Sequence, residues 1–224
     1  NFVSGATVVD DAANEEADVT ISGGGVAAVE TLMTLSGLDC DIVGGNTGYI
    51  VTKRAWGLTL EPAGTVNYTA YGTYSWGFNH TTFFNKDIEF DCIIWGAIYI
   101  EDIDAFVVIG LSGTDFPQTS TVRHFGIRVN EGALKIVSAD GTTRSELDLA
   151  TTLASSTPYH IRCKFTVGSK IEVWIDGVLK TAKTNNLPSG TLSTAKGVPF
   201  CYCKTLYNEI NDFMVHGLKV KRAI

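Results

Sequence analysis

Apolar and polar side chains alternate with a period of two residues along most of the chain, which is the spacing of a half-buried β-strand. The alternating runs are short and end at Gly, Asn or Asp, the residue types that favour turns. Strands are predicted at 49–53, 57–61, 65–73, 75–79, 87–95, 105–111, 122–130, 133–138, 159–167, 170–175, 178–184, 199–206 and 213–222. Many short strands joined by such turns indicate an all-β sandwich.

Three connections carry a specific turn signal. Asp176-Gly177 lies between two alternating runs and predicts a two-residue hairpin, because that turn type needs positive φ angles. The stretches 130–132 (Asn-Glu-Gly) and 140–141 (Asp-Gly) mark two more turns.

Residues 1–25 differ from the rest of the chain. Two short alternating pieces flank an acidic turn at 10–14, and a run of three glycines follows at 23–25. This pattern predicts a two-stranded hairpin, which is too small to be stable alone and needs the main domain or another copy of itself. At 26–38 partial helical spacing competes with β-branched residues, and both interpretations stay open. We therefore expect an N-terminal arm and linker over 1–48 and a sandwich domain over 49–224.

Composition narrows the class of protein. Hydrophobic residues make up 45% of the chain and charged residues 18%, which is a globular composition. The net charge is −7 and no basic stripe is visible, so nucleic acid is not an expected partner. No apolar run approaches the roughly 20 residues that span a bilayer, so no membrane insertion is expected.

The cysteines give no disulfide framework. There are five, and an odd number argues against full pairing, although one bridge stays open. Because side chains alternate along a strand, Cys201 and Cys203 are expected on the same face. We expect small buried thiols rather than a zinc site, which needs more ligands at close spacing.

The N-terminal segment, NFVSGATVVDDAAN followed by ADVTISGGG, resembles connector segments of bacteriophage and virus tail, fibre and head-decoration proteins. The resemblance covers about a tenth of the chain. It implies contacts with virion proteins, a virion or extracellular location, and a homo-oligomer that is usually a trimer.

A second resemblance covers residues 50–224. The stretches YHIR, GSKIEVWIDGVL, FGIR, GALKI and FMVHGLKV are similar to concanavalin A-like and laminin-G-like domains. This implies a jelly-roll β-sandwich of the lectin and glucanase kind. It does not fix the function, because this fold hosts lectins, glycosidases, lyases, adhesion modules and viral spikes.

Glycoside hydrolysis needs two carboxyl groups about 5 to 9 Å apart across the sugar bond. Glucanases of the resembled fold carry a Glu-x-Asp-x-(x)-Glu strand, and Glu89-Phe90-Asp91 supplies its first two acids. The sequence continues as CIIW, so the closing glutamate is missing. The alternative is that Glu89 and Asp91 lie on a solvated face while Phe90 and Cys92 point to the core.

Asp102 and Asp104 form the second acidic group. Their hard oxygens could bind Ca²⁺, but the segment lacks the further ligands and the central Gly of an EF-hand loop. A Ca²⁺ site here would take its other ligands from distant segments. The alternative is a solvated loop between strands.

Arg123, His124 and Arg128 follow a long loop and form a candidate ligand-binding group. Lyases of the resembled fold use His, Tyr and Arg or Gln to neutralise a uronate and move a proton. The resemblance implies such roles for these residues together with Tyr99, if the fold brings them to one face.

Aromatic residues gather at 68–76, in YTAYGTYSW. Aromatic faces stack on the apolar faces of sugars, and Tyr and Trp keep a polar tip. Tyr71, Tyr74 and Trp76 are therefore candidate sugar-binding residues, although rings of this kind also fill sandwich cores.

Together these features predict a jelly-roll β-sandwich with a short N-terminal β arm, which recognises a carbohydrate such as a host-surface glycan, or a protein. The missing closing carboxylate favours a non-catalytic virion surface or fibre protein. The alternative is a carbohydrate-active enzyme of the same fold, either a glycoside hydrolase or a polysaccharide lyase. No cofactor is expected apart from the Ca²⁺ that Asp102 and Asp104 could bind.

Overall fold

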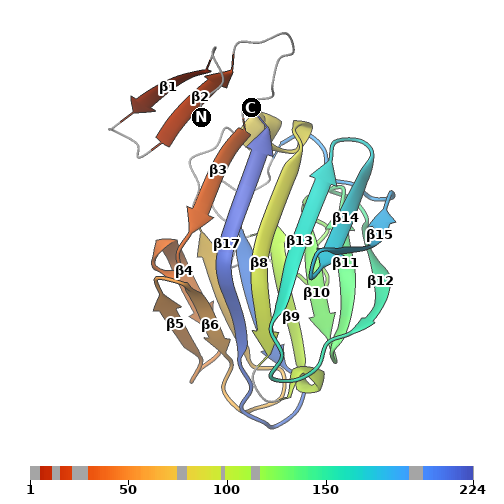
Figure 1. Cartoon of the computed structure of the whole chain (residues 1–224). Helices are drawn as coiled ribbons and strands as arrows, with labels where there is room; N and C mark the ends of the chain where they lie inside the picture. Colours follow the sequence, from red (N-terminus) through yellow and green to blue (C-terminus); the bar gives the residue numbers. More distant parts are fainter. Residues whose placement is uncertain are drawn as a thin grey trace.

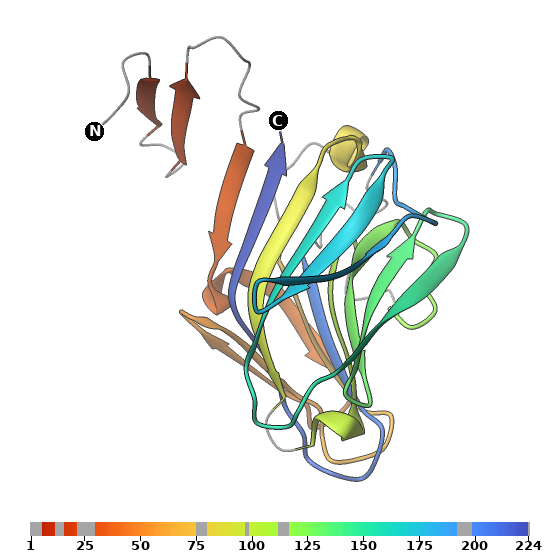
Figure 2. The same ribbon diagram turned by 45° about the vertical axis from the view of Figure 1, so that its right-hand side comes forward.

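A computed structural model of the chain describes residues 6–11, 16–21, 30–74, 80–96, 99–111, 117–191 and 199–223. Within these ranges the regular elements are β-strands and three short 3₁₀ helices, η1 (Gly37–Asp39), η2 (His80–Asn85) and η3 (Ile100–Asp102). In the described part of the chain, no helix has the length and apolarity that a bilayer crossing requires. Two antiparallel sheets account for most strands, as Figures 1 and 2 show, and the predicted all-β sandwich is confirmed.

The first sheet has seven strands. Their order is β12 (Arg144–Thr152), β11 (Ala133–Ala139), β10 (His124–Asn130), β9 (Ile103–Ile109), β16 (Phe200–Thr205), β7 (Thr69–Tyr74) and β4 (Cys40–Gly45). Strands β9 and β10 are neighbours in sequence, whereas β16 arrives from far along the chain and pairs with both β9 and β7.

The second sheet has eight strands. Seven follow the order β15 (Val178–Lys183), β14 (Lys170–Ile175), β13 (Tyr159–Thr166), β8 (Ile88–Gly96), β17 (Phe213–Ala223), β6 (Gly57–Glu61) and β5 (Ile50–Arg54). The eighth is β3 (Glu30–Leu35), which pairs with the C-terminal half of β17. Long β17 therefore pairs with β6 along its first half and with β3 along its second.

The hydrophobic core lies between the two sheets, where inward residues alternate with outward ones. On β8, Phe90 and Cys92 are at most 1% exposed, so the expectation that they point to the core is confirmed. Helix η2 adds Phe84, whose ring meets Phe125 and Phe165 edge-on. Such edge-to-face pairs add to the free energy of burial.

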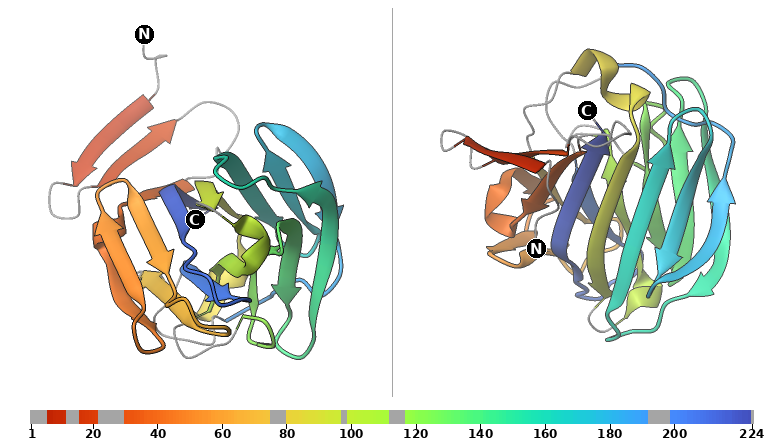
Figure 3. Two further views of the ribbon diagram at one scale, coloured as in Figure 1. Left: turned by 90° about the horizontal axis from the view of Figure 1, so that it is seen from below. Right: turned by 45° about the horizontal axis from the view of Figure 1, so that its top comes forward.

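The expected hairpin near the N-terminus is present, since β1 (Ala6–Asp11) pairs antiparallel with β2 (Glu16–Ile21). It stands beside the sandwich and not between its sheets (Figures 2 and 3). The sandwich begins earlier than the expected boundary at residue 48, because β3 and β4 already pair with β17 and β7. The helical alternative at 26–38 is wrong where the structure describes it, because pairing with β17 holds 30–35 extended.

The turn signals were specific. Asp176 and Gly177 have φ angles of 50° and 80°, and Glu131 and Gly132 have 51° and 77°, as two-residue hairpins with positive φ require. Strand β12 was not predicted, although Leu149 lies in the core and Leu147 packs against it. The expected strand at 75–79 lies outside the described residues.

All five cysteines are free and buried, as expected. Cys201 and Cys203 lie on the same face of β16 and belong to the core between the sheets. Their neighbours on β16 must therefore face away from the core, and this alternation builds the candidate site.

Candidate functional site

The candidate site lies on the outer face of the seven-stranded sheet. With Cys201 and Cys203 inward, β16 turns Phe200, Tyr202 and Lys204 outward. Cross-strand pairing aligns Tyr202 with Tyr71 on β7 on one side and with Phe106 on β9 on the other. A row of outward residues thus crosses the sheet perpendicular to its strands.

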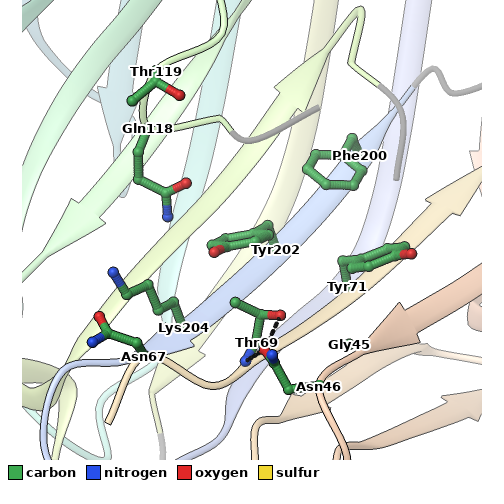
Figure 4. A pocket seen from close by; sticks show the side chains of 10 residues that line it. All are labelled: Gly45, Asn46, Asn67, Thr69, Tyr71, Gln118, Thr119, Phe200, Tyr202 and Lys204. Atoms are coloured by element: carbon green, nitrogen blue, oxygen red, sulfur yellow. Dashed lines mark hydrogen bonds between the residues drawn. The ribbon is translucent and has the colours of Figure 1, made fainter. Parts of the chain in front are cut away.

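An open groove of about 520 Å³ follows this face, as Figure 4 shows from close by. Its floor comes from β7 and β16, and its walls come from Gly45 at the end of β4 and from loops at 46, 67 and 118–119. The residues that line it are Gly45, Asn46, Asn67, Thr69, Tyr71, Gln118, Thr119, Phe200, Tyr202 and Lys204. Lys204 and Asn67 lie at one end of the groove and Phe200 at the other (Figure 4).

Three aromatic rings form the apolar part of the groove, of which Tyr71 is partly exposed, whereas Phe200 and Tyr202 are 0% and 3% exposed and belong to a buried cluster beneath it. The ring of Phe200 lies 5.8 Å from that of Tyr71 and 6.1 Å from that of Tyr202, measured between centroids. Tyr71 lies across β4 at Gly44, where an added Cβ atom would be 2.3 Å from the Tyr71 hydroxyl oxygen. The absence of a side chain at Gly44 therefore lets the Tyr71 ring lie down over the sheet.

Two asparagines position the polar wall. The Asn46 side-chain oxygen accepts hydrogen bonds from the backbone amide and hydroxyl of Thr69, at 2.8 and 2.7 Å. Asn67 has a φ angle of 67°, and its amide donates to the carbonyl of Thr205 at 2.9 Å. Asn tolerates this left-handed conformation better than most residues, so the loop that holds Asn67 is locally specified.

Tyr202 is 3% exposed, and burial raises the pKa of its phenol to about 12, although a hydrogen bond with Gln118 acts in the opposite direction. Tyr202 is therefore a neutral phenol at neutral pH. It can share hydrogen bonds with a ligand, but it is a poor base.

An ion-pair network continues the outer face beyond the groove. Arg128 on β10 donates to both carboxylate oxygens of Asp104, at 2.7 and 3.0 Å, and to Glu146 on β12 at 2.8 Å. Its guanidinium also lies 5.2 Å from the Phe106 ring centroid. The Asp104 and Glu146 interactions keep the pKa of Arg128 above its usual value, although burial alone would lower it.

The aromatic candidates have separate positions. Tyr71 lines the groove. Tyr74 was expected to bind the ligand, and this expectation needs correction: it is 1% exposed and lies in the core, and burial raises the pKa of its phenol far above normal. Tyr74 follows Tyr71 by three residues on one strand, so the two side chains point to opposite faces of the sheet. Trp76 lies outside the described residues.

The basic candidates do not converge on the groove. The Arg123 guanidinium packs over the turn at Gly141, where an added Cβ would be 3.2 Å from its Cζ. His124 is fully buried, with Nδ1 2.6 Å from the carbonyl oxygen of Val122. Arg128 shares the outer face with Tyr71, but it is held by carboxylates rather than directed into the groove.

The expected metal ligands are not arranged for a cation. Asp104 is 2% exposed, and both its oxygens are occupied by Arg128, with Gln118 donating at 3.1 Å. Asp102 lies on η3, where burial and the charges of Glu101 and Glu209 raise the pKa of its carboxyl. Within the described ranges, no three His, Cys, Asp or Glu residues gather as a metal ion would require. The pairing with Arg128 corrects the interpretation of Asp104 as a metal ligand.

Glu89 and Asp91 lie on the outer face of the other, eight-stranded sheet. Each has a partner on β13: Glu89 binds Arg162 at 2.7 Å, and Asp91 lies 2.8 Å from Nε2 of His160. The face also carries Trp174, with the Arg162 guanidinium 4.7 Å from its ring centroid. These acids are on a solvent-facing surface, as the alternative to catalysis supposed.

The sequence interpretation missed Phe200, Tyr202 and Lys204, as well as the amides of the groove wall. The signal for the first three was available, because placing Cys201 and Cys203 inward places their neighbours outward. Nothing local predicts that β16 lies between β7 and β9, and this pairing decides which rings meet.

No protein-family model and no curated protein sequence matches this chain. Solved structures do resemble it. A protein of unknown function from Shewanella oneidensis MR-1 aligns with a TM-score of 0.60 at 10% identity, over 89% of each chain. Endo-β-1,4-glucuronan lyase from the fungus Trichoderma reesei aligns with a TM-score of 0.54 at 11% identity, over 85% of this chain and 94% of that one.

A third structure is of botulinum neurotoxin type C, described as depending on two ganglioside molecules for cell entry. Its TM-score is 0.52 at 5% identity, over 97% of this chain and 47% of that one. Identities this low show a shared β-sandwich fold and nothing finer. That fold carries both binding domains and an enzyme.

Proposed function

We propose that this chain is a non-catalytic recognition domain of a virion surface or fibre, which binds a glycan through the groove on the outer face of the seven-stranded sheet. The observation that carries the proposal is the ring of Tyr71, which is partly exposed, packs on buried Phe200 and lines one open groove. Asn and Gln amides stand beside it. Rings that stack on sugar faces and amides that bind hydroxyls are what sugar recognition needs.

The groove is also held ready for a ligand. Two of its rings are on β16, an interior strand paired on both sides, and Tyr71 is on the adjacent β7. Residues on paired strands lose little conformational freedom when a ligand binds, which favours affinity. The glycan-dependent toxin and the glucuronan lyase support the proposal to the extent that this fold serves saccharide contacts elsewhere.

The position of the groove fits attachment through the N-terminal arm. The β1–β2 hairpin and the C-terminus lie at one end of the sandwich (Figure 1). The connection from β16 to β17 runs across the other end (Figure 1), and the loop of Asn67 binds it, since Asn67 donates to Thr205 and the Val66 amide to Asn208. A domain anchored by its arm would therefore present this end of the groove away from the anchor.

A carbohydrate-active enzyme is the second candidate, favoured by the presence of Tyr202 and Lys204 in one groove. Lys204 could neutralise a uronate, and a tyrosine could transfer a proton. The raised pKa of Tyr202 argues against a base of this kind. The groove lining includes no Asp or Glu among the described residues, so it offers no carboxyl pair for hydrolysis.

A glycan array probed with wild type and with Tyr71→Ala tests recognition. We expect Tyr71→Ala to weaken binding about tenfold, because one stacking ring is lost. Trp56→Ala is the matched control, since Trp56 is 48% exposed and packs on His216 of the eight-stranded sheet. Equal binding by Tyr71→Ala and wild type would contradict the groove as the binding site.

Incubation with mixed polysaccharides separates the two candidates. New reducing ends, or absorbance from unsaturated uronates, would identify an enzyme if Tyr202→Phe abolished their formation. We expect neither product from the wild-type protein.

Sedimentation tests the assembly part of the proposal. We expect the full chain to form a homo-oligomer, such as the trimer that the resemblance of its N-terminal segment to fibre connectors implies. A chain lacking residues 1–25 should sediment with fewer copies in each particle. A monomeric full chain, unchanged by the deletion, would refute a role of the arm in oligomerisation.

A further inference from the structure

We infer that the groove prefers sugars bearing a carboxylate, and that the Lys204 ammonium is the group that recognises it. This inference rests on the proposed function and specifies its ligand class. It follows from the charges on the outer face of the seven-stranded sheet.

Lys204 is the charged residue of the groove lining that the structure describes, the other nine being neutral. No carboxylate of the described residues lies within 4 Å of its ammonium. The side chain is partly buried beside rings, where an ammonium without a counter-ion interacts strongly with an arriving anion. The groove therefore has a positive charge to compensate.

The cross-strand partner of Lys204 on β9 is an acid, Asp104. Asp104 turns its carboxylate the other way, toward Arg128 at 2.7 and 3.0 Å and Gln118 at 3.1 Å. Arg128 in turn binds Glu146, which also accepts from Arg144 on the far side. Asp104 and Glu146 are therefore paired with arginines, and Lys204 is not part of this ion-pair network.

The amides of the groove lining also favour an acceptor-rich ligand. Since the Asn46 side-chain oxygen already accepts two hydrogen bonds from Thr69, its NH₂ group is the part left to donate. An ammonium and an amide NH₂ suit a carboxylate flanked by hydroxyls, while the Tyr71 ring suits the apolar face of the same sugar. A neutral sugar would use the Tyr71 ring and leave the ammonium uncompensated.

Paired probes test the preference by calorimetric titration of the whole chain. One pair is a glucuronate oligomer and the same oligomer with its carboxyls reduced to alcohols. The other is sialyllactose and lactose, so the two pairs distinguish a uronate from a sialate as the source of the carboxylate. The variants are Lys204→Gln, which removes the charge, and Lys204→Arg, which keeps it. Lys219→Gln removes an equal, exposed charge from the eight-stranded sheet.

We expect wild type to bind the acidic member of at least one pair about tenfold more tightly, as a charge-assisted hydrogen bond allows. Lys204→Gln should lose this preference and keep its affinity for the neutral member. Lys204→Arg and Lys219→Gln should keep the preference, and rising salt should weaken it.

Equal affinity of wild type for both members of each pair would overturn the carboxylate preference and leave glycan binding intact. An equal loss in Lys219→Gln and Lys204→Gln would overturn it as well, because the effect would then be one of net charge. The proposed function itself fails, and the inference with it, if no probe binds wild type or if Tyr71→Ala binds every probe normally.

Discussion

Replacing Asp104 with alanine tests the ion-pair network that stabilises the outer face of the seven-stranded sheet. The Asp104 side chain is 3% exposed, and the Arg128 side chain is 17% exposed. Two hydrogen bonds of 2.7 and 3.0 Å join them in a fork-to-fork pair. Removing the carboxylate leaves a largely buried guanidinium with part of its compensation lost.

The expected cost follows from what Arg128 retains. Breaking a buried pair by removing one partner costs about 3 to 5 kcal/mol of stability. Arg128 keeps Glu146 at 2.8 Å and Asn130 at 2.6 Å, and it is partly solvated, so the loss is reduced. We expect Asp104→Ala to lower the free energy of unfolding by about 2 to 3 kcal/mol.

The double variant Asp104→Ala/Arg128→Met separates the energy of the Asp104–Arg128 interaction from the effect of changing each residue alone. Methionine can still cover the Phe106 ring, and the uncompensated charge is gone, so the double variant should be more stable than the sum of the single losses predicts. We expect a coupling energy of about 1 to 2 kcal/mol.

Urea unfolding, followed by tryptophan fluorescence, measures the stability of wild type, the two single variants and the double variant. The comparison requires that the free energy of unfolding falls with urea concentration at the same slope in all four. A loss below about 0.5 kcal/mol in Asp104→Ala, or strict additivity, would refute a stabilising role for the pair. The same assay tests whether Asp104 binds a metal ion. We expect calcium and chelators to leave the wild-type midpoint unchanged, whereas a calcium shift abolished by Asp104→Ala would show that Asp104 binds the ion.

Single sites provide three more tests. Gly44→Ala should displace the flexible end of Tyr71, which weakens glycan binding and lowers the free energy of unfolding by about 1 kcal/mol. In Gly126→Ala the new Cβ would lie 2.2 Å from a backbone atom of β9, so thermal unfolding should show a stability loss several times larger. Burial lowers the pKa of Lys183 from 10.5 to about 8, so the folded state binds fewer protons than the unfolded state between these values and wild-type stability gains with rising pH there. Urea titrations should show wild-type stability rising between pH 8 and 10, and Lys183→Met should remove this rise; a wild-type stability that is flat over this range would contradict the lowered pKa. Burial raises the pKa of the Cys163 thiol, so maleimide should label no described cysteine of the native protein within minutes and all five in urea; rapid native labelling would contradict the burial.

Much of the fold was predictable because sandwich strands carry a local signal in their alternating side chains. Strands β6 and β14 have the predicted bounds, and the Asp176-Gly177 turn has the predicted positive φ angles. Strands β3 and β4 were missed because their placement depends on β17 and β7, which are far away in sequence. Partial helical spacing at 26–38 could not reveal that the edge of β17 would pair with this segment.

The site was less predictable because it is assembled across strands. Tyr71 was found from its aromatic neighbours, but the same reasoning selected Tyr74, which alternation places in the core. Arg128 and Asp104 were expected to bind a ligand and a metal, and they bind each other instead. A sequence shows which residues are charged, but only cross-strand register shows which charges neutralise one another.

This distinction also separates the two outer faces as candidates for recognition. On the eight-stranded sheet, Glu89 is paired with Arg162 and Asp91 with His160, both on β13, so a ligand that displaced either pair would have to make up for the interactions it broke. On the seven-stranded sheet, the acids are likewise paired with arginines, but no described carboxylate pairs with Lys204, which follows Phe200 and Tyr202 along the outer face of β16. A ligand arriving there gains a charge interaction without breaking one. Ligand binding is therefore expected on the outer face of the seven-stranded sheet, and not on the face of the eight-stranded sheet that carries Glu89 and Asp91.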